Sequence, residues 1–121
     1  MIEMVEKEKV EQALAQIMDQ IPEVEGLIAA DYNGNVLIGQ TLTEMDHKKL
    51  IEETLSVINA SKKLSKEIEK GGIKEIRLSS EEGFTLIILG KDLVFCAITG
   101  TDAAPSLGLI VRNLTVVLKQ F

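Results

Sequence analysis

The five residues Asp31-Tyr32-Asn33-Gly34-Asn35 carry the oxygen-rich side chains that calcium prefers, in the order of the first half of a calcium-binding loop. Such a loop needs glycine at its sixth position and glutamate at its twelfth. Those positions hold Val36 and Leu42, so the pattern fails. Asn-Gly is instead the strongest short signal for a β-hairpin, because both residues tolerate positive φ. We therefore expect a turn between two strands here and no metal site.

Two other side chains, His47 and Cys96, could in principle act as a base or a nucleophile. His47 is the only histidine, and no cysteine lies near it in the sequence to complete a metal site. No nucleophile accompanies it either. Cys96 lies within an apolar run, whereas a reactive thiol needs an electropositive, partly open setting. We expect a packing or solvent-facing role for His47 and a buried structural role for Cys96.

The glycines that could cradle a phosphate do not form a phosphate-binding pattern. Neither Gly71-Gly72 nor Gly100-Thr101 matches the spacing of the two common nucleotide-binding loops. The carboxylates lie mostly among lysines on predicted helix surfaces, and none forms an evident acid–base pair. We therefore predict a protein that is not an enzyme, with no catalytic residues, no cofactor and no metal.

The composition is that of one acidic domain, predicted to span residues 1–121. A net charge of −6 argues against nucleic-acid binding, which needs a basic patch. The single cysteine fits a reducing compartment, and the charged start MIEMVEKEKV does not resemble a signal peptide. No apolar run approaches the ~20 residues of a membrane span. We expect a soluble, cytoplasmic protein without membrane insertion.

The elements that must position these residues are organised around one hairpin. Its two runs, 84–89 and 93–99, are apolar at both alternating positions, whereas a strand with one buried face alternates with polar residues. These strands belong in the middle of a sheet with helices on both faces. The whole pattern predicts an α+β fold of order α-β-β-α-β-β-β-α with an antiparallel five-stranded sheet. The other predicted elements are helices over 3–21, 43–70 and from about 105 onward, and strands over 24–31, 36–40 and 73–80.

The long middle helix, with Thr43 as its predicted N-cap and Lys70 near its end, is the most informative element after the hairpin. Its apolar arc covers about half the circumference, wider than the ~100° stripe of a helix that packs on one surface. Small hydroxyl residues run along the middle of the arc. One flank consists of Leu50, Val57, Leu64 and Ile68, the other of Ile51, Leu55 and Ile58, and the line between them of Thr54, Ser61 and Ser65.

Two apolar flanks imply two partners for this helix, of which one is its own sheet. The following strand, 73–80, alternates like a half-exposed strand at a sheet edge, and open edges invite pairing with another chain. Both elements would be covered if they met their copies across a two-fold axis. The predicted homodimer interface is Leu50, Thr54, Val57, Ser61, Leu64, Ile68, Ile76 and Arg77.

Three segments of the sequence carry a family likeness. Residues 21–34, IPEVEGLIAADYNG, resemble the opening "I-P-x-V-x-G… D-x-x-G" hairpin of roadblock-type domains, the family named for the dynein light chain roadblock. Residues 90–95 resemble its late turn and strand, and 106–112, SLGLIVR, resemble the start of its last helix. The order of elements agrees over nearly the whole chain. The resemblance implies the roadblock/profilin-like fold, and the short chain looks like a stand-alone prokaryotic member.

The resemblance also implies a function. Such domains dimerise through the long helix and the following strand, and they serve as platforms for small Ras-like GTPases, as GTPase-activating cofactors, or as parts of motor and lysosomal scaffolds. We expect a non-enzymatic homodimeric adaptor that binds a small Ras-like GTPase and modulates its nucleotide state or location. The partner-binding residues are not identified, and neither arginine, Arg77 or Arg112, is marked as an arginine finger. Two alternatives remain: a structural subunit of a larger complex, and a small-molecule sensor of profilin- or PAS-like shape.

Overall fold

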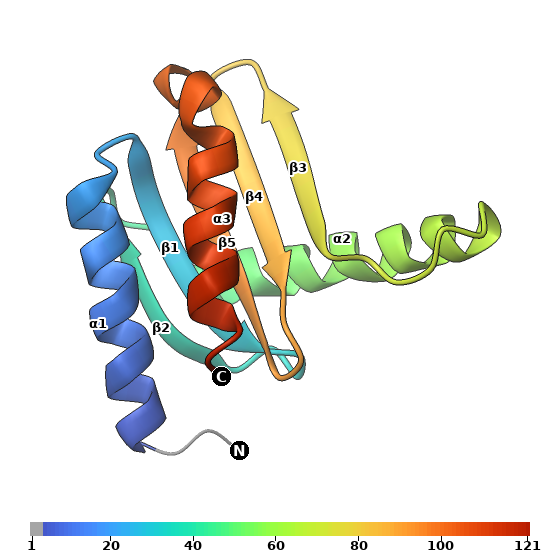
Figure 1. Ribbon diagram of the computed structural model, residues 1–121, viewed down its shortest axis with the longest axis horizontal. Coiled ribbons are helices and arrows are strands. Elements are labelled where there is room, and N and C mark those ends of the chain that lie inside the picture. The colour runs from blue at the N-terminus through green and yellow to red at the C-terminus, as the bar shows by residue number, and fades with distance from the viewer. Residues whose placement is uncertain (1–3) are drawn as a thin grey trace.

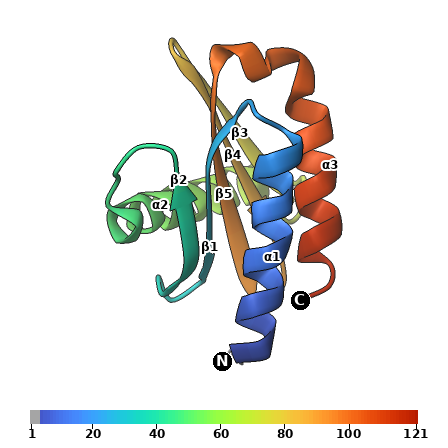
Figure 2. The same cartoon turned by 90° about the vertical axis from the view of Figure 1, so that its left-hand side faces the viewer.

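The protein folds into a five-stranded antiparallel sheet with helices on both faces. The computed structural model describes residues 4–121. The strand order is β2-β1-β5-β4-β3. Helices α1 and α3 cover one face, and α2 lies across the other (Figures 1 and 2). The elements are α1 (Met4–Gln20), β1 (Val24–Asp31), β2 (Val36–Thr41), α2 (His47–Glu67), β3 (Glu75–Ser80), β4 (Gly83–Leu89), β5 (Leu93–Gly100), η1 (Thr101–Ser106) and α3 (Leu107–Leu118).

This arrangement confirms the predicted α+β fold and the predicted order of elements, with a short 3₁₀ helix, η1, added before α3. Pro105, expected in the first turn of the last helix, lies within η1 instead. The predicted start of the first helix, at residue 3, lies outside the described residues.

The central strand is β5, which pairs with β1 on one side and β4 on the other. Its side chains alternate between two apolar clusters, one on each face of the sheet. Phe95 belongs to the cluster under α1 and α3, and Cys96 belongs to the cluster under α2. The prediction that the hairpin 84–99 needs cover on both faces is therefore confirmed.

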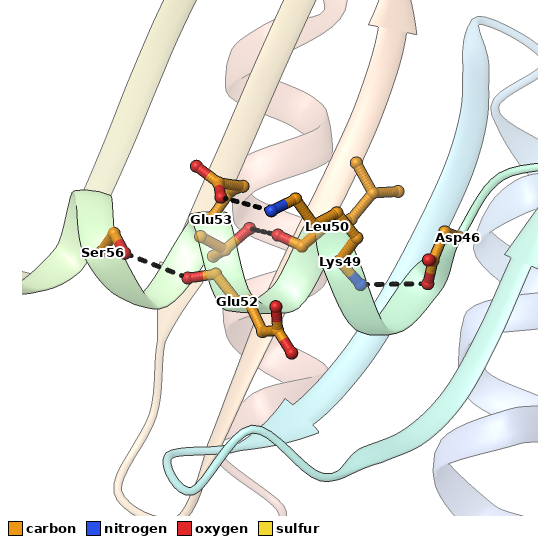
Figure 3. Close-up of polar contacts among 7 residues, drawn as sticks. Asp46, Lys49, Leu50, Glu52, Glu53 and Ser56 are labelled. Atoms are coloured by element: carbon orange, nitrogen blue, oxygen red, sulfur yellow. Dashed lines mark hydrogen bonds and ion pairs between the residues drawn. The ribbon is translucent and has the colours of Figure 1, made fainter.

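The start of α2 differs from the prediction. The N-cap is Asp46, whose side chain accepts a 3.1 Å hydrogen bond from the backbone N–H of Lys49 (Figure 3). Thr43, the predicted N-cap, lies in the preceding loop, where its carbonyl oxygen accepts a hydrogen bond from the hydroxyl of Thr41. The predicted N-cap was therefore wrong by three positions. The ionised carboxylate of Asp46, which both accepts the N–H and interacts favourably with the helix dipole, forms the cap.

The end of α2 also differs in detail. The helix was predicted to reach about Lys70 and to stop at Gly71-Gly72, but it ends at Glu67. The chain turns at Glu69, the one non-glycine residue with positive φ, 57°, among the described residues. A hydrogen bond of 2.9 Å from the N–H of Lys70 to the carbonyl of Ser65 closes the helix end. This geometry normally selects glycine at the left-handed position, and here glutamate occupies it.

Candidate functional site

The long helix α2 runs across the strands and extends past the edge strand β3 (Figure 1). Its buried residues are Ile51, Thr54, Ile58 and Ser65. Ile51 and Ile58 belong to the apolar cluster under α2, whereas the hydroxyl of Ser65 donates a hydrogen bond to the carbonyl oxygen of Gly71 in the loop after the helix. The buried residues recur at helical spacing and match the inner part of the predicted apolar arc. The N-terminal part of α2 covers the sheet, and its C-terminal part extends beyond the edge of the sheet (Figure 1).

One predicted flank of α2 remains largely uncovered. Leu64, near the C-terminal end of α2, is 63% exposed, and Ile68, the residue that directly follows the helix, is 54% exposed. Leu50 and Val57, further back on the same flank, are half-buried against the cluster under α2. The second half of this flank is therefore exposed to solvent and has no apolar partner among residues 4–121.

Thr54, also predicted to lie at the dimer interface, is buried within the single chain. It is only 6% exposed, and its hydroxyl donates hydrogen bonds to the carbonyl oxygen of Leu50 at 2.7 Å and to Sγ of Cys96 at 3.7 Å. Thr54 therefore packs against the protein's own sheet. Ser61, by contrast, is half-buried on the surface of the helix.

Strand β3 forms one edge of the sheet, as predicted, and pairs only with β4. Ile76 is half-buried and Arg77 is exposed. The guanidinium of Arg77 forms a 2.9 Å ion pair with Glu75 of the same strand, on a surface where such a pair contributes little to stability. The C-terminal part of α2 extends beyond the same edge of the sheet that β3 forms (Figure 1).

A second feature, which the sequence did not reveal, is a cleft of about 780 Å³ between the C-terminal part of α2 and the β4–β5 turn. We call it the basic cleft, and its lining includes Tyr32, Lys62, Lys66, Ile73, Leu89 and Lys91. These residues come from four separate stretches of the chain. No local pattern joins them, and the only signal in the sequence was the density of lysines along α2.

His47 and Cys96, the two side chains that could in principle act as a base or a nucleophile, both pack within the fold. His47 is half-buried beside Gly39, with Nε2 3.1 Å from the hydroxyl oxygen of Thr41. This packing role is one of the two that were predicted for His47. Cys96 is buried, and burial raises the pKa of its thiol, which leaves it protonated and unreactive near neutral pH.

Asp31 closes the β1–β2 turn. Its carboxylate accepts hydrogen bonds from the backbone N–H groups of Asn33 and Asn35 and from the side-chain amide of Asn35, at 2.9 to 3.0 Å. Burial alone would raise the pKa of Asp31, but these hydrogen bonds outweigh it and lower the pKa. The predicted hairpin turn is confirmed, with Gly34 at a φ of 90°.

Within residues 4–121, no three His, Cys, Asp or Glu side chains gather as they would around a metal ion. In the same part of the chain, every helix is too short or too polar to cross a membrane.

Comparison with known proteins gives a consistent result. Residues 10–99 match the family model described as Roadblock/LC7 domain. No curated protein matches the sequence. Among solved structures, MglB of Myxococcus xanthus superposes with a TM-score of 0.84 at 16% identity, covering 98% of this chain and 88% of that one.

Two further structures are similar. The gliding protein MglB of Thermus thermophilus gives a TM-score of 0.81 at 12% identity, covering 99% of this chain and 96% of that one. A structure described as MglB with tetrameric arrangement gives 0.75 at 15% identity, covering 93% and 86%. At these identities the likeness establishes a shared fold.

Proposed function

The chain belongs to the Roadblock/LC7 domain family, and from this premise we propose that it is a non-enzymatic homodimeric adaptor for a small Ras-like GTPase. In this proposal the dimer binds the GTPase and modulates its nucleotide state or its location in the cytoplasm. The observation that carries the proposal is the uncovered flank of α2 beside the open edge of β3.

The proposed dimer would cover the apolar side chains of α2 and the strand edge that are exposed in the single chain. The exposed side chains of Leu64 and Ile68 would gain an apolar partner if two copies of α2 packed against each other. The same two-fold axis would let β3 pair with its copy and close the sheet edge. Leu50, Val57, Ser61, Ile76 and Arg77 would lie at this interface, with Thr54 beneath it in each subunit.

The GTPase part of the proposal rests on family membership. The resemblance to roadblock-type domains implies a platform for small Ras-like GTPases, and one of the similar MglB structures is described as a gliding protein. Arg77 is engaged by Glu75, and Arg112 is an exposed residue of α3. We therefore expect the adaptor to act by positioning the GTPase's own loops, without donating an arginine to the transferred phosphate.

The first experiment measures the mass in solution by light scattering for the wild type, Leu64→Asp and the control Ser56→Asp. Ser56 is an exposed residue of α2 outside the uncovered flank. We expect a wild-type dimer, a folded Leu64→Asp monomer and a Ser56→Asp dimer. A wild-type monomer would overturn the proposed assembly.

The second experiment measures binding to small GTPases encoded beside this gene, each loaded with GDP or with a non-hydrolysable GTP analogue. An adaptor that modulates the nucleotide state must distinguish the two forms. Equal binding to both forms would favour the alternative of a structural subunit.

A further inference from the structure

The basic cleft concentrates positive charge in a protein whose net charge is −6. The side chains of Lys62, Lys66 and Lys91 line it, with Glu69 as the only carboxylate among its lining residues. Charge of one sign in a hollow attracts ligands of the opposite sign more strongly than the same charges on a convex surface do. We propose that the basic cleft binds an acidic peptide segment of a partner protein.

The floor of the cleft is apolar and fixed in position. Tyr32 lies at the β1–β2 turn, and its hydroxyl donates a 2.6 Å hydrogen bond to the carbonyl oxygen of Gly90 in the β4–β5 turn. Nζ of Lys62 lies 5.4 Å from the centroid of the Tyr32 ring, within the range of a cation–π interaction. Ile73 and Leu89 add aliphatic surface. Apolar side chains of a peptide would find contacts here between its carboxylates.

The shape favours an extended ligand. A second hollow of about 610 Å³ shares Leu89, Gly90 and Lys91 with the basic cleft and so adjoins it at the β4–β5 turn. Two further lysines, Lys74 and Lys119, and one carboxylate, Glu75, line this second hollow beside apolar residues of α3, and Glu75 is paired with Arg77. Carboxylates spaced along a peptide can meet ammonium groups that are distributed over both hollows.

A compact phosphate fits the cleft less well. Phosphate sites commonly use backbone N–H groups at a helix N-terminus, whereas the cleft lies at the C-terminal end of α2, where no helix N–H groups point into it. The hydroxyls nearby are already engaged, since Tyr32 donates to Gly90 and Ser65 donates to the carbonyl of Gly71. Glu69 would repel a phosphate, but its carboxylate can accept a hydrogen bond from a peptide N–H.

The lysines of the basic cleft that lie on α2 are on another side of the helix than the uncovered flank. Residues two positions apart in an α-helix point about 200° apart around its axis. Lys62 and Lys66 are each two positions from Leu64, so their side chains leave α2 on nearly the opposite side from Leu64. The uncovered flank and the cleft therefore face different sides of α2. Binding of an acidic peptide can be tested separately from dimerisation and from GTPase binding.

The test is fluorescence anisotropy with a short fluorescein-labelled peptide of alternating glutamate and leucine, at low salt. The variants are Lys62→Glu with Lys66→Glu, Lys91→Glu alone, and the control Lys63→Glu, an exposed residue of α2 outside the cleft lining. We expect saturable binding to the wild type, weakened about tenfold or more by each cleft variant and about twofold or less by the control. Circular dichroism verifies that each variant is folded.

Three results would overturn the proposal. One is the absence of saturable binding to the wild type. Another is an equal loss in the Lys63→Glu control, which would show a general charge effect. The third is displacement of the peptide by tripolyphosphate at a lower concentration than by unlabelled peptide, which would assign the cleft to a small phosphate ligand.

Discussion

The hydroxyl of Tyr32 donates a 2.6 Å hydrogen bond to the carbonyl oxygen of Gly90, which lies 58 residues further along the chain. This bond joins the turn of the β1–β2 hairpin to the turn of the β4–β5 hairpin. Burial raises the pKa of Tyr32, and the nearby carboxylate of Asp92 adds to this effect. Tyr32 is the only tyrosine, so its ionisation can be followed directly.

The first prediction concerns the titration of Tyr32. Its absorbance should change at a pH above the ordinary value of about 10. Because the folded state holds the proton more tightly than the unfolded state, this contribution to stability is complete below pH ~10 and is lost as pH rises through the folded pKa.

The variant Tyr32→Phe separates this effect from the lysines, which titrate in the same range. It should lose about 1 kcal/mol in urea denaturation at neutral pH, the usual contribution of one such hydrogen bond. The stability difference between wild type and variant should shrink above pH ~10. A tyrosine that ionises at its ordinary pH would contradict the first prediction.

The second prediction concerns the left-handed residue at the end of α2. Glu69→Gly should raise the free energy of unfolding by about 1 kcal/mol, because glycine adopts a φ of 57° without the steric penalty of a side chain. Glu69→Ala removes the same charge but keeps the penalty, so it should remain near the wild type in a denaturant titration. Equal stability of the two variants would mean that the backbone is not strained there.

The third prediction separates the two sides of α2. Thr54→Asp places a carboxylate among apolar residues under the sheet and should destabilise the fold by about 3 kcal/mol or more. Leu64→Asp changes an exposed side chain and should leave each subunit folded while it abolishes the dimer. Parallel measurements of thermal unfolding and of mass give opposite patterns for the two variants. Loss of folding in Leu64→Asp would contradict the proposed interface.

The fourth prediction concerns the contact between Gly39 and His47. A Cβ atom at Gly39 would collide with the imidazole ring, lying 2.8 Å from its Cε1. Gly39→Ala should therefore cost about 1–3 kcal/mol in thermal or chemical denaturation.

Two further variants serve as controls for this prediction: a double variant at Gly39 and His47, and an alanine substitution at another glycine. Gly39→Ala combined with His47→Ala should recover part of the loss, because the ring that the new methyl group meets is gone. Gly72→Ala should have little effect, since nothing lies within 4 Å of its added Cβ. Additive losses at Gly39 and His47 would show that the two sites do not interact.

The hydrophobic patterns of the strands predicted the fold well, because each pattern fits only one position in the sheet. The hairpin around Lys91-Asp92 is apolar on both sides, and only a central position in the sheet covers both. The position of β3 at the edge followed from its alternating polar residues. The predicted N-cap of α2, Thr43, was wrong, because the side chain of Asp46, three residues further on, is also able to cap a helix and forms the cap.

The surfaces were harder to predict. A helical wheel places Thr54 between two flanks, but it does not give the angle at which α2 meets the sheet, and that angle buries Thr54. The basic cleft depends on Tyr32, Lys62 and Lys91, which only the completed fold brings together. The proposed dimer, its interface residues and the GTPase remain predictions.

The single neighbour of β3 has a consequence for how the protein responds to its own concentration. Each edge strand leaves alternate backbone N–H and C=O groups unpaired, and β3 pairs only with β4. If two copies pair through β3, mass action makes the midpoint of thermal unfolding rise with protein concentration. Amide hydrogens on the outer edge of β3 would then exchange slowly in concentrated solution and quickly on dilution, while those of β5 would stay protected.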